Sequence, residues 1–593
     1  MLRTHTCGEI TTGNMSEEIT LCGWISSRRD HGEIIFMDLR DKYGITQIVF
    51  DPAKNKEVHE KAHSLRNEFC VGIKGVVAKR PEGTVNPKIV TGEVELEVKE
   101  IQVFSRSETP PFEIEDDINV YEDVRLKYRY LDLRRNVMQK KLTMKHKAYS
   151  LISDFLDKEK FIQVETPMLT KSTPEGARDY LVPSRIQQGS FYALPQSPQI
   201  FKQLLMVSGV DRYFQIVRCF RDEDLRADRQ PEFTQLDMEM SFVEQEDILK
   251  TSERLFALLF SQIAGVEIKL PLPRLQYKET MNKYGSDKPD TRFEVFLNDF
   301  TTDIDERCEF KIFNNVVASG GKIMGLAAPG YGDLSRKEIN DLTEFVGEFG
   351  AKGLAFFKVE EDGLTSPISK FFKEDLLELF KQKTGAKTGD MIFLVADSKE
   401  TTLDALGALR LKIGRDKDLI DNNRFDLLWV VDFPLFKFNA EENRWASEHH
   451  PFTSFREEDM HYLESGEFSK IRSLSYDLVL NGSEIGSGSI RIHKGDIQKK
   501  IFDVLGLTDE ECQEKFGFLL EAFRYGPPPH GGVAFGMDRL ITVFTKDSSI
   551  REVIPFPKTQ KGICPMTEAP SQVESDKLRD LGIKLIKREE DKN

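Results

Sequence analysis

The sequence predicts an α+β protein with several domains. Its 593 residues correspond to about four domains or large insertions at roughly 150 residues per domain. Runs that alternate between polar and apolar residues, as β-strands do, fill the first hundred positions, whereas strand and helix patterns alternate along most of the remaining chain. The chain is 39% hydrophobic and 31% charged, so it can bury a large core. It has no run of about 18 apolar residues, so no membrane-spanning helix is expected.

The charge and cysteine content disfavour several further types of protein. The chain has 83 basic and 99 acidic side chains, and the net charge of −16 disfavours a protein that coats nucleic acid by bulk charge. A local strip from 125 to 147 nevertheless has nine Lys or Arg and one acid, Asp132, and is either a solvated helix face or a phosphate-contacting hinge. The seven cysteines form no CxxC pair, and the first residues lack the apolar stretch of a signal peptide. We therefore predict a cytoplasmic protein without a disulfide framework or a zinc site.

The first domain, 1–105, is predicted to be a five-stranded barrel. The strand-like runs are 19–26, 34–40, 45–50, 71–78 and 94–104, and a helical segment, 55–68, lies between the third and the fourth. Five strands with a helix after the third is the order of an OB-fold, a common reader of single-stranded nucleic acid. Trp24 and Phe36 fall on one strand face beside Arg28 and Arg29, and these rings either pack in the core or stack on bases.

Composition divides the rest of the chain. A linker with consecutive prolines covers 106–140. Glycine-rich turns and a self-contained α/β pattern mark 288–415 as an inserted domain. The segments on either side, 141–287 and 416–555, are expected to form one domain together, followed by a polar extension, 556–593.

The common nucleotide-binding loops are missing from the sequence. It contains neither GxxxxGK[ST] nor a GxGxxG that follows a strand, so any phosphate handling has to come from arginines and a metal. Arg221 begins a strand–loop–strand segment and Arg229 lies late in its loop. Two such guanidinium groups can hold a polyphosphate from two sides, because each bonds phosphate bidentately and stays charged.

Two further segments also contain residues that could bind phosphate or its metal ion. Asp477 and Glu484 flank a glycine-rich turn and would make a hard oxygen site suited to Mg²⁺ that bridges phosphates. The segment 531–540 combines glycines with Arg539 at a strand end. Each feature alone is also typical of surface ion pairs, turns or close packing; their combination and order are more specific.

The order of these segments resembles the class II aminoacyl-tRNA synthetases. Pro167 after a helix and a strand, the Phe220-Arg221 to Phe233 loop, and Gly536-Met-Asp538-Arg539 are similar to motifs 1, 2 and 3 of that family. The strings at 196–203, 221–233 and 482–486 resemble those of its bacterial-type aspartyl members. The resemblance implies an OB-fold barrel, a catalytic domain with an antiparallel sheet, and an inserted GAD-type α/β domain, although the Gly-Ala-Asp string of that insertion reads Val395-Ala396-Asp397 here.

The resemblance also implies a two-step reaction. Aspartate would attack the α-phosphate of ATP to give aspartyl-adenylate and pyrophosphate, and the terminal adenosine hydroxyl of tRNA would then take the aspartyl group. Arg221 would neutralise the α-phosphate and Arg539 would hold the γ-phosphate, with Mg²⁺ on Asp477 and Glu484. The positions that match the ATP site are Arg221, Asp222, Glu223, Gln230, Glu484, Gly536, Met537, Asp538 and Arg539. In-line displacement at phosphorus depends on positioning and charge neutralisation, which arginines and a metal supply.

The choice of amino acid follows from charge. Lys202 and Arg491 resemble residues that bind the side-chain carboxylate of aspartate, with His450 nearby. The positions that would surround the rest of the ligand are Glu175, Ser197, Gln199, Arg221 and Asp237. A site built to bond a specific polar group rejects analogues without it by roughly 10⁴-fold, so asparagine should be refused.

The range of tRNAs is a separate question. Arg29, Phe36 and Gln47 match anticodon-contacting positions of the family. His31 and Gly83 resemble residues of relaxed members that charge both tRNA(Asp) and tRNA(Asn), whose anticodons differ at the third base. A neutral imidazole can donate or accept a hydrogen bond, so it tolerates either base. We therefore predict charging of both tRNAs; alternatively His31 only fills a turn, and the enzyme acts on tRNA(Asp) alone.

Other interpretations also fit parts of the sequence. Asparaginyl- and lysyl-tRNA synthetases share the three motifs, but the large insertion and the Lys202/Arg491 pair disfavour both. A non-catalytic OB-fold RNA-binding protein would not need an intact Arg221, Asp477, Glu484 and Arg539. The segment around Pro167 resembles the family's dimer-forming motif, so a homodimer is expected.

Overall fold

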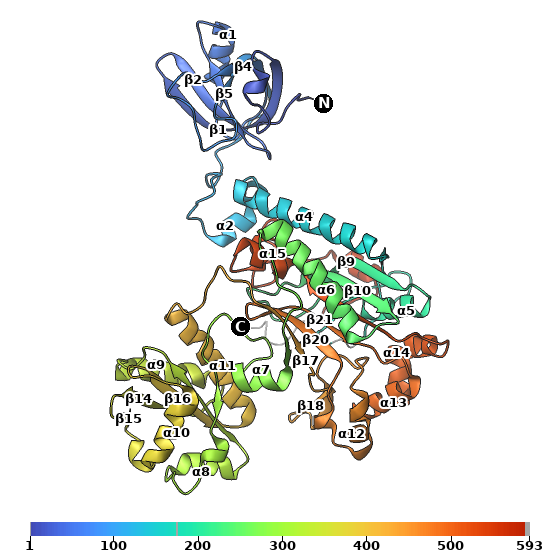
Figure 1. Cartoon of the computed structure of the whole chain (residues 1–593). Helices are drawn as coiled ribbons and strands as arrows, with labels where there is room; N and C mark the ends of the chain where they lie inside the picture. The colour runs from blue at the N-terminus through green and yellow to red at the C-terminus, as the bar shows by residue number, and fades with distance from the viewer. Residues whose placement is uncertain (1, 174–175, 587–593) are drawn as a thin grey trace. The chain divides into compact units, whose positions relative to one another are not determined.

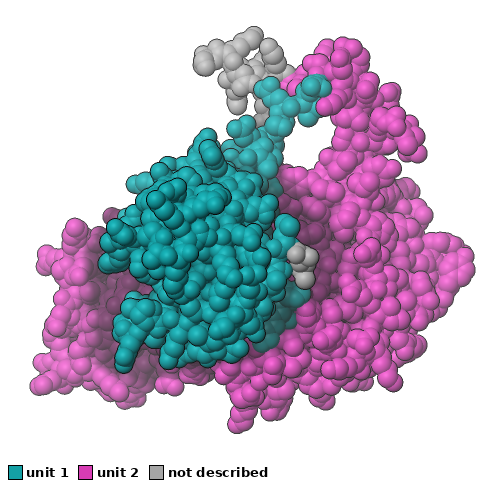
Figure 2. Space-filling model, turned by 90° about the horizontal axis from the view of Figure 1, so that it is seen from above, with its two compact units in different colours: residues 1–147, 225–230, 541–574 teal, residues 148–224, 231–540, 575–593 magenta. Residues whose placement is uncertain are grey.

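The computed structural model describes residues 2–173 and 176–586 (Figure 1). The chain forms two compact units, which Figure 2 colours separately. The first contains residues 1–147, 225–230 and 541–574, and the second contains 148–224, 231–540 and 575–593. Within the described ranges, no helix is long and apolar enough to span a membrane.

The N-terminal part of the first unit is a closed five-stranded barrel with the strand order β1-β2-β3-β5-β4. Its elements are β1 (Glu18–His31), β2 (Ile34–Arg40), β3 (Ile45–Phe50), α1 (Lys56–Ala62), β4 (Cys70–Lys79) and β5 (Val94–Ser105). β3 pairs with β5 in parallel, and the other neighbours are antiparallel. Alternate strand residues fill the interior, as the period of two requires. The predicted OB-fold is confirmed.

The basic strip covers α2 (Glu122–Lys127), α3 (Arg129–Asp132), the turn that follows α3, and the beginning of α4 (Asn136–Lys158). Asp132 is fully buried and accepts hydrogen bonds from Arg129 at 2.5 Å and from Arg135 at 2.6 Å. Three more basic residues pair with acids of the same unit: Arg125 with Glu552, Arg134 with Glu68 and Lys141 with Asp547. These five residues form ion pairs within the unit, so the interpretation as a solvated helix face is wrong for them. A phosphate contact by the strip stays a prediction.

The second unit is organised around an eight-stranded sheet with the order β11-β17-β20-β21-β22-β10-β9-β6. The strands are β6 (Ile162–Gln163), β9 (Arg212–Phe220), β10 (Glu232–Ser241), β11 (Arg274–Gln276), β17 (Leu427–Val431), β20 (Ser475–Leu480), β21 (Ser483–Ile490) and β22 (His530–Gly536). The six inner strands are antiparallel, as predicted, whereas the short edge strands β11 and β6 pair in parallel with their neighbours. The site described below is built mainly from these inner strands.

Helices and two hairpins surround this sheet. Outside the insertion described below, the α-helices with residues in the second unit are α4, α5 (Gln199–Val207), α6 (Gln245–Leu259), α7 (Tyr277–Tyr284), α12 (Met460–Ser465), α13 (Gly495–Val504), α14 (Asp509–Phe523), α15 (Met537–Thr545) and α16 (Ser575–Asp580). The hairpins are β7 (Leu181–Pro183) with β8 (Phe191–Ala193), and β18 (Phe436–Asn439) with β19 (Arg444–Ser447). α6 packs on the sheet, where Phe256 meets Phe535 of β22 with ring centroids 4.9 Å apart.

The segment that the sequence marks as an insertion has a sheet of its own, ordered β12-β13-β16-β14-β15 (Figure 1). The strands are β12 (Asn298–Asp299), β13 (Lys322–Ala328), β14 (Ala355–Glu360), β15 (Gly363–Thr365) and β16 (Met391–Asp397). One core cluster joins it to α9 (Arg336–Gly347) and α11 (Lys399–Asp416), and another joins its opposite face to α8 (Lys311–Ala318) and α10 (Glu374–Thr384). Successive residues of β16 alternate between the two clusters, so both faces of this sheet are covered. Val395-Ala396-Asp397 ends that strand.

Candidate functional site

Four charged side chains meet in the interior of the second unit. Lys202 Nζ on α5 lies 3.0 Å from Asp237 Oδ1 and 3.1 Å from Glu239 Oε2, both on β10. Arg491, which follows β21, donates from Nε to Glu239 Oε1 at 2.9 Å and from Nη2 to Oε2 at 3.1 Å. Each of these side chains is at most 2% exposed. Two cations and two anions are thus paired where an unpaired charge would be costly.

This cluster brings together three predicted residues, Lys202, Asp237 and Arg491, and adds Glu239, which the sequence analysis did not name. Glu239 is two positions after Asp237 on a strand, so both side chains point to the same face of the sheet. Once Lys202 and Arg491 are assigned to one pocket, that spacing could have identified a second acid facing them.

The two carboxylates differ in their electrostatic surroundings. Burial raises the pKa of Asp237 to about 6, although Lys202 acts in the opposite direction. Burial also acts to raise the pKa of Glu239, but Arg491 and Lys202 together lower it to about 2. The Lys202 ammonium lies 3.0 Å from Asp237 Oδ1, whereas Asp237 Oδ2 has no hydrogen-bond donor among the described residues. Asp237 therefore has unused capacity for a cationic group of a ligand.

His450 contacts the Nη1 group of Arg491, which does not pair with Glu239. Its Nε2 lies 2.6 Å from Arg491 Nη1, and burial together with the Arg491 charge lowers the pKa of His450 well below its usual value. A neutral imidazole can accept the hydrogen bond that Arg491 donates. Arg491 Nη1 also donates to Ser489 Oγ at 2.6 Å. The guanidinium is thus held by three side chains.

Two further residues predicted to bind the amino acid, Ser197 and Gln199, lie at the start of α5. The backbone N–H of Gln199 donates to Ser197 Oγ at 3.3 Å, and Gln199 precedes Lys202 by about one helical turn. The buried Nε2 of Gln199 lacks a hydrogen-bond acceptor among the described residues. Glu175, the other predicted residue, lies outside the residues that the structure describes.

Arg221 stands where β9 ends and the loop to β10 begins. Its guanidinium carbon lies 5.1 Å from the ring centroid of Phe233, and its backbone N–H donates to the carbonyl of Pro231 at 2.9 Å. Stacking on an aromatic face orients the cation and leaves its N–H groups for a ligand. The next two predicted residues, Asp222 and Glu223, follow in the same loop.

Gln230 and Asp538 have structural partners in the regions predicted to bind ATP. Both ends of the Gln230 amide bond the backbone of Lys558 within the first unit, at 3.0 and 2.8 Å. Asp538, just inside α15, accepts a hydrogen bond from the backbone N–H of Thr234 at 2.8 Å. Contacts of these two side chains with ATP stay predictions, as do those of Gly536 and Met537 at the β22–α15 junction.

Asp477 on β20 and Glu484 on β21 come from paired strands. Burial raises the pKa of Glu484, and the charge of Asp477 raises it further, so the two carboxylates repel each other. Arg539 Nη1 donates to the backbone carbonyl of Glu484 at 2.5 Å. No group of three metal-ligating side chains occurs in the part of the chain that the structure describes. Two carboxylates nevertheless suit Mg²⁺, which commonly takes its other ligands from water and phosphate.

The barrel carries a second cluster on the outer face of β1, β2 and β3. Arg29 pairs with Asp38 at 2.9 Å and donates to Gln47 Oε1 at 3.3 Å. Arg29 lies opposite Phe36 in the register, and the ring of His31 is 6.3 Å from that of Phe36. The structure therefore brings four predicted tRNA-binding residues onto one face.

Other residues of the barrel extend this description. Glu95 on β5, which the sequence analysis missed, accepts a hydrogen bond from Gln47 Nε2 at 2.8 Å, and burial raises its pKa. Trp24 is not available as an open stacking platform, because the guanidinium carbon of Arg134 lies 4.7 Å from its ring centroid. Gly83 occupies the loop between β4 and β5 with φ of +83° and open space where a side chain would start.

Comparison with known proteins adds sequence relationships to this geometry. Residues 121–560 match the family model described as tRNA synthetases class II (D, K and N), and residues 19–104 match the OB-fold nucleic acid binding domain. The chain is 54% identical, over 99% of its length and 97% of the other protein, to Aspartate--tRNA(Asp/Asn) ligase of Moorella thermoacetica. It is 53% identical to the protein of the same name from Natranaerobius thermophilus, over 99% of this chain and 100% of that protein.

Solved structures support the fold. An aspartyl tRNA synthetase from Entamoeba histolytica superposes with a TM-score of 0.56 at 19% identity, covering 93% of this chain and 90% of that one. An asparaginyl-tRNA synthetase from Pyrococcus horikoshii, complexed with asparaginyl-adenylate, gives a TM-score of 0.58 at 17% identity, covering 94% and 99%. At these identities the likeness concerns the architecture alone.

Proposed function

Because this chain belongs to the class II tRNA synthetases of the D, K and N group, we propose that it uses ATP to attach L-aspartate to tRNA through aspartyl-adenylate. The observation that carries the choice of amino acid is the buried Lys202–Glu239–Arg491 cluster. Two cations at one place suit a side-chain carboxylate. The side-chain NH₂ group of asparagine would face the N–H donors of Lys202 and Arg491. Mismatches of this kind in a buried polar site disfavour the wrong substrate by roughly 10⁴-fold.

The other side chains then have definite tasks. Lys202 and Arg491 hold the side-chain carboxylate of aspartate, and Asp237, which has unused acceptor capacity, receives the ammonium.

Arg221 neutralises the α-phosphate while the carboxylate attacks phosphorus, and Arg539 holds the γ-phosphate. Asp477 and Glu484 are the proposed Mg²⁺ ligands, and the ion, when bound, would neutralise phosphate charge. Proper positioning and charge neutralisation are sufficient for this displacement.

We also propose that the enzyme charges both tRNA(Asp) and tRNA(Asn) in the cytoplasm. The relatives named Aspartate--tRNA(Asp/Asn) ligase support the dual range. His31 lies beside Phe36 on the proposed anticodon face, and Gly83 has no side chain to contact a base. The two nitrogens of an imidazole allow it to serve as donor or acceptor, so a contact from His31 would not discriminate the third anticodon base.

The decisive experiment compares amino acids and tRNAs in one protein preparation. We expect ATP–pyrophosphate exchange with aspartate but not with asparagine or lysine, followed by aspartylation of purified tRNA(Asp) and tRNA(Asn) at similar kcat/KM. ATP–pyrophosphate exchange with aspartate, together with charging of tRNA(Asp) but not of tRNA(Asn), would show that the enzyme discriminates between the two tRNAs. Absence of exchange with all three amino acids would favour a non-catalytic RNA-binding protein.

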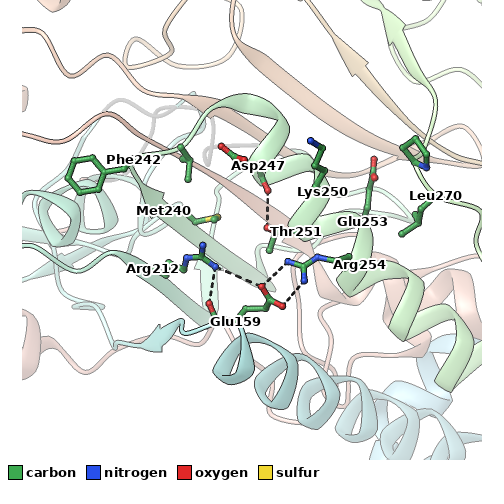
Figure 3. Close-up of a pocket in the computed structure, with 12 residues that line it drawn as sticks. Glu159, Arg212, Met240, Phe242, Asp247, Lys250, Thr251, Glu253, Arg254 and Leu270 are labelled. Carbon is green, nitrogen blue, oxygen red and sulfur yellow. Dashed lines mark hydrogen bonds and ion pairs between the residues drawn. The ribbon is translucent and has the colours of Figure 1, made fainter.

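A homodimer is the assembly that we propose, and a surface of the second unit supports it (Figure 3). The short strand β6 is the last strand of the eight-stranded sheet, and its residues are exposed. Beside it lies an open cavity of about 730 Å³ lined by three acids and three bases. The acids are Glu159, Asp247 and Glu253, and the bases are Arg212, Lys250 and Arg254. This balanced charge suits a self-complementary contact between two copies better than it suits nucleic acid.

Phe242 is the apolar anchor of this surface. It lines the cavity, is 72% exposed, and has a backbone φ of +58°, which is uncommon for a bulky residue. A hydrogen bond from its N–H to the carbonyl of Pro529 holds it there. In Figure 3 it lies at one end of the cavity and Leu270 at the other. A large apolar side chain held in water by an unfavourable backbone indicates a partner.

Phe242→Asp should therefore convert the dimer into monomers, because two buried carboxylates would face each other or the partner's apolar surface. Sedimentation velocity at micromolar concentration measures this. Tyr525→Asp is the matched control, since Tyr525 is 74% exposed at the end of a helix in the same unit. A Phe242→Asp variant that sediments as a dimer would exclude this surface, and a monomeric wild-type protein would exclude the homodimer itself.

A further inference from the structure

We propose that Glu239 is a positioning residue that makes the amino-acid pocket selective for a carboxylate over a carboxamide; this inference rests on the proposed function. Glu239 is fully buried and is bonded to both basic side chains at once. It acts through Lys202 and Arg491 and not by touching the substrate.

A count of hydrogen-bond donors shows how this works. Arg491 has five N–H groups. Two go to Glu239, and the two on Nη1 face Ser489 Oγ and His450 Nε2, which leaves one on Nη2. Lys202 has three, and its ion pairs with Asp237 and Glu239 leave one. Among the described contacts, each cation thus retains a single N–H for a ligand.

Two remaining donors match the two oxygens of a carboxylate. A carboxamide offers one acceptor oxygen and one NH₂ group, so one of its ends would meet a donor instead of an acceptor. Without Glu239, both cations would have additional free donors and fewer fixed directions. The selectivity then depends on Glu239 as much as on the positive charges themselves.

Gly532 gives an independent indication that the fold reserves space for this carboxylate. Gly532 on β22 lies opposite Glu239 in the strand register. A Cβ atom built on Gly532 would lie 1.9 Å from Glu239 Oε2 and 2.1 Å from the carbonyl oxygen of Met238. Any side chain at position 532 would displace the carboxylate from between the two cations.

Glu239→Gln tests the proposal directly. A glutamine amide has one acceptor oxygen, and its NH₂ group would face donors of Lys202 or Arg491. We expect the KM for aspartate in ATP–pyrophosphate exchange to rise roughly 50-fold, and the selectivity for aspartate over asparagine to fall at least about tenfold. The KM for ATP should change less than about threefold, because the proposed phosphate-binding arginines are not contacted by Glu239.

A second buried acid separates positioning from general stability. Asp290 in the same unit is also buried and bonded to an arginine, Arg292. Asp290→Asn should lower the unfolding temperature without changing the ratio of the two KM values or the selectivity. Glu239→Asp keeps the charge but retracts the carboxylate by one methylene, so the aspartate KM and the selectivity should take intermediate values.

The outcomes distinguish this inference from the proposed function. If the wild-type protein does not activate aspartate, the proposed function fails before any variant is compared. If it does, and Glu239→Gln retains the wild-type KM ratio and selectivity, the positioning role alone is wrong. Should the glutamine variant not fold, Glu239→Asp decides, since wild-type values in that variant would equally overturn the proposal.

Discussion

Arg491→Leu should lower aspartate-dependent ATP–pyrophosphate exchange by about 10³-fold, because it removes one partner of a buried, hydrogen-bonded charge pair. Arg491 is the side chain that combines bidentate pairing to Glu239 with hydrogen bonds to Ser489 and His450. The variant should bind ATP normally but should no longer bind aspartate with measurable affinity. Exchange kinetics at varied aspartate concentration measure the effect, and near-normal exchange would contradict the assignment of this pocket.

The same substitution should also destabilise the protein by about 3–5 kcal/mol, since Glu239 would be left buried with Lys202 as its main counter-charge. Thermal unfolding of the purified variant checks this expectation. Arg491→Lys separates the two effects: it keeps a cation near Glu239 but cannot form the bidentate pair. We expect it to fold more stably than the leucine variant while aspartate activation remains at least about 10²-fold impaired.

The barrel illustrates how much local pattern can predict. Its five strands follow from period-two alternation, and each was located within a few residues apart from the longer β1. The sequence pattern predicts a helical segment over 55–68 between the third and fourth strands, but α1 ends at Ala62. Glu68 instead has a positive φ of +64° and pairs with Arg40 and Arg134. These contacts of Glu68 are tertiary, and local sequence does not contain them.

Long-range pairing also explains the error over the basic strip. Arg125 pairs with Glu552 and Lys141 with Asp547, more than 400 positions away along the chain. A local count of charge cannot detect such partners, so it overestimates how many basic groups face solvent. In the candidate site, by contrast, Lys202, Asp237 and Arg491 were identified through motif resemblance, and the structure places them in contact. Glu239 was missed because the resemblance names groups expected at the ligand, whereas Glu239 lies behind them.

Arg221→Ala should reduce ATP–pyrophosphate exchange by roughly 10²–10³-fold, the usual cost of losing a preorganised group at a developing charge. The loss should appear mainly in kcat, since charge on the α-phosphate grows as the carboxylate attacks. Arg221→Lys should recover little activity, because a lysine ammonium neither stacks on Phe233 in the same way nor bonds phosphate bidentately.

Arg218 provides the control for this prediction. It lies three positions earlier on β9 and pairs with Glu232 at 2.8 Å, with 41% of its side chain exposed. Surface pairs of this kind contribute about 0–1 kcal/mol, so Arg218→Ala should leave exchange and stability nearly unchanged. If Arg221→Ala and Arg218→Ala behaved alike at saturating ATP and aspartate, Arg221 would have no part in the transition state. The α-phosphate charge would then have to be neutralised by the other groups assigned to the triphosphate, Arg539 and the proposed metal site at Asp477 and Glu484.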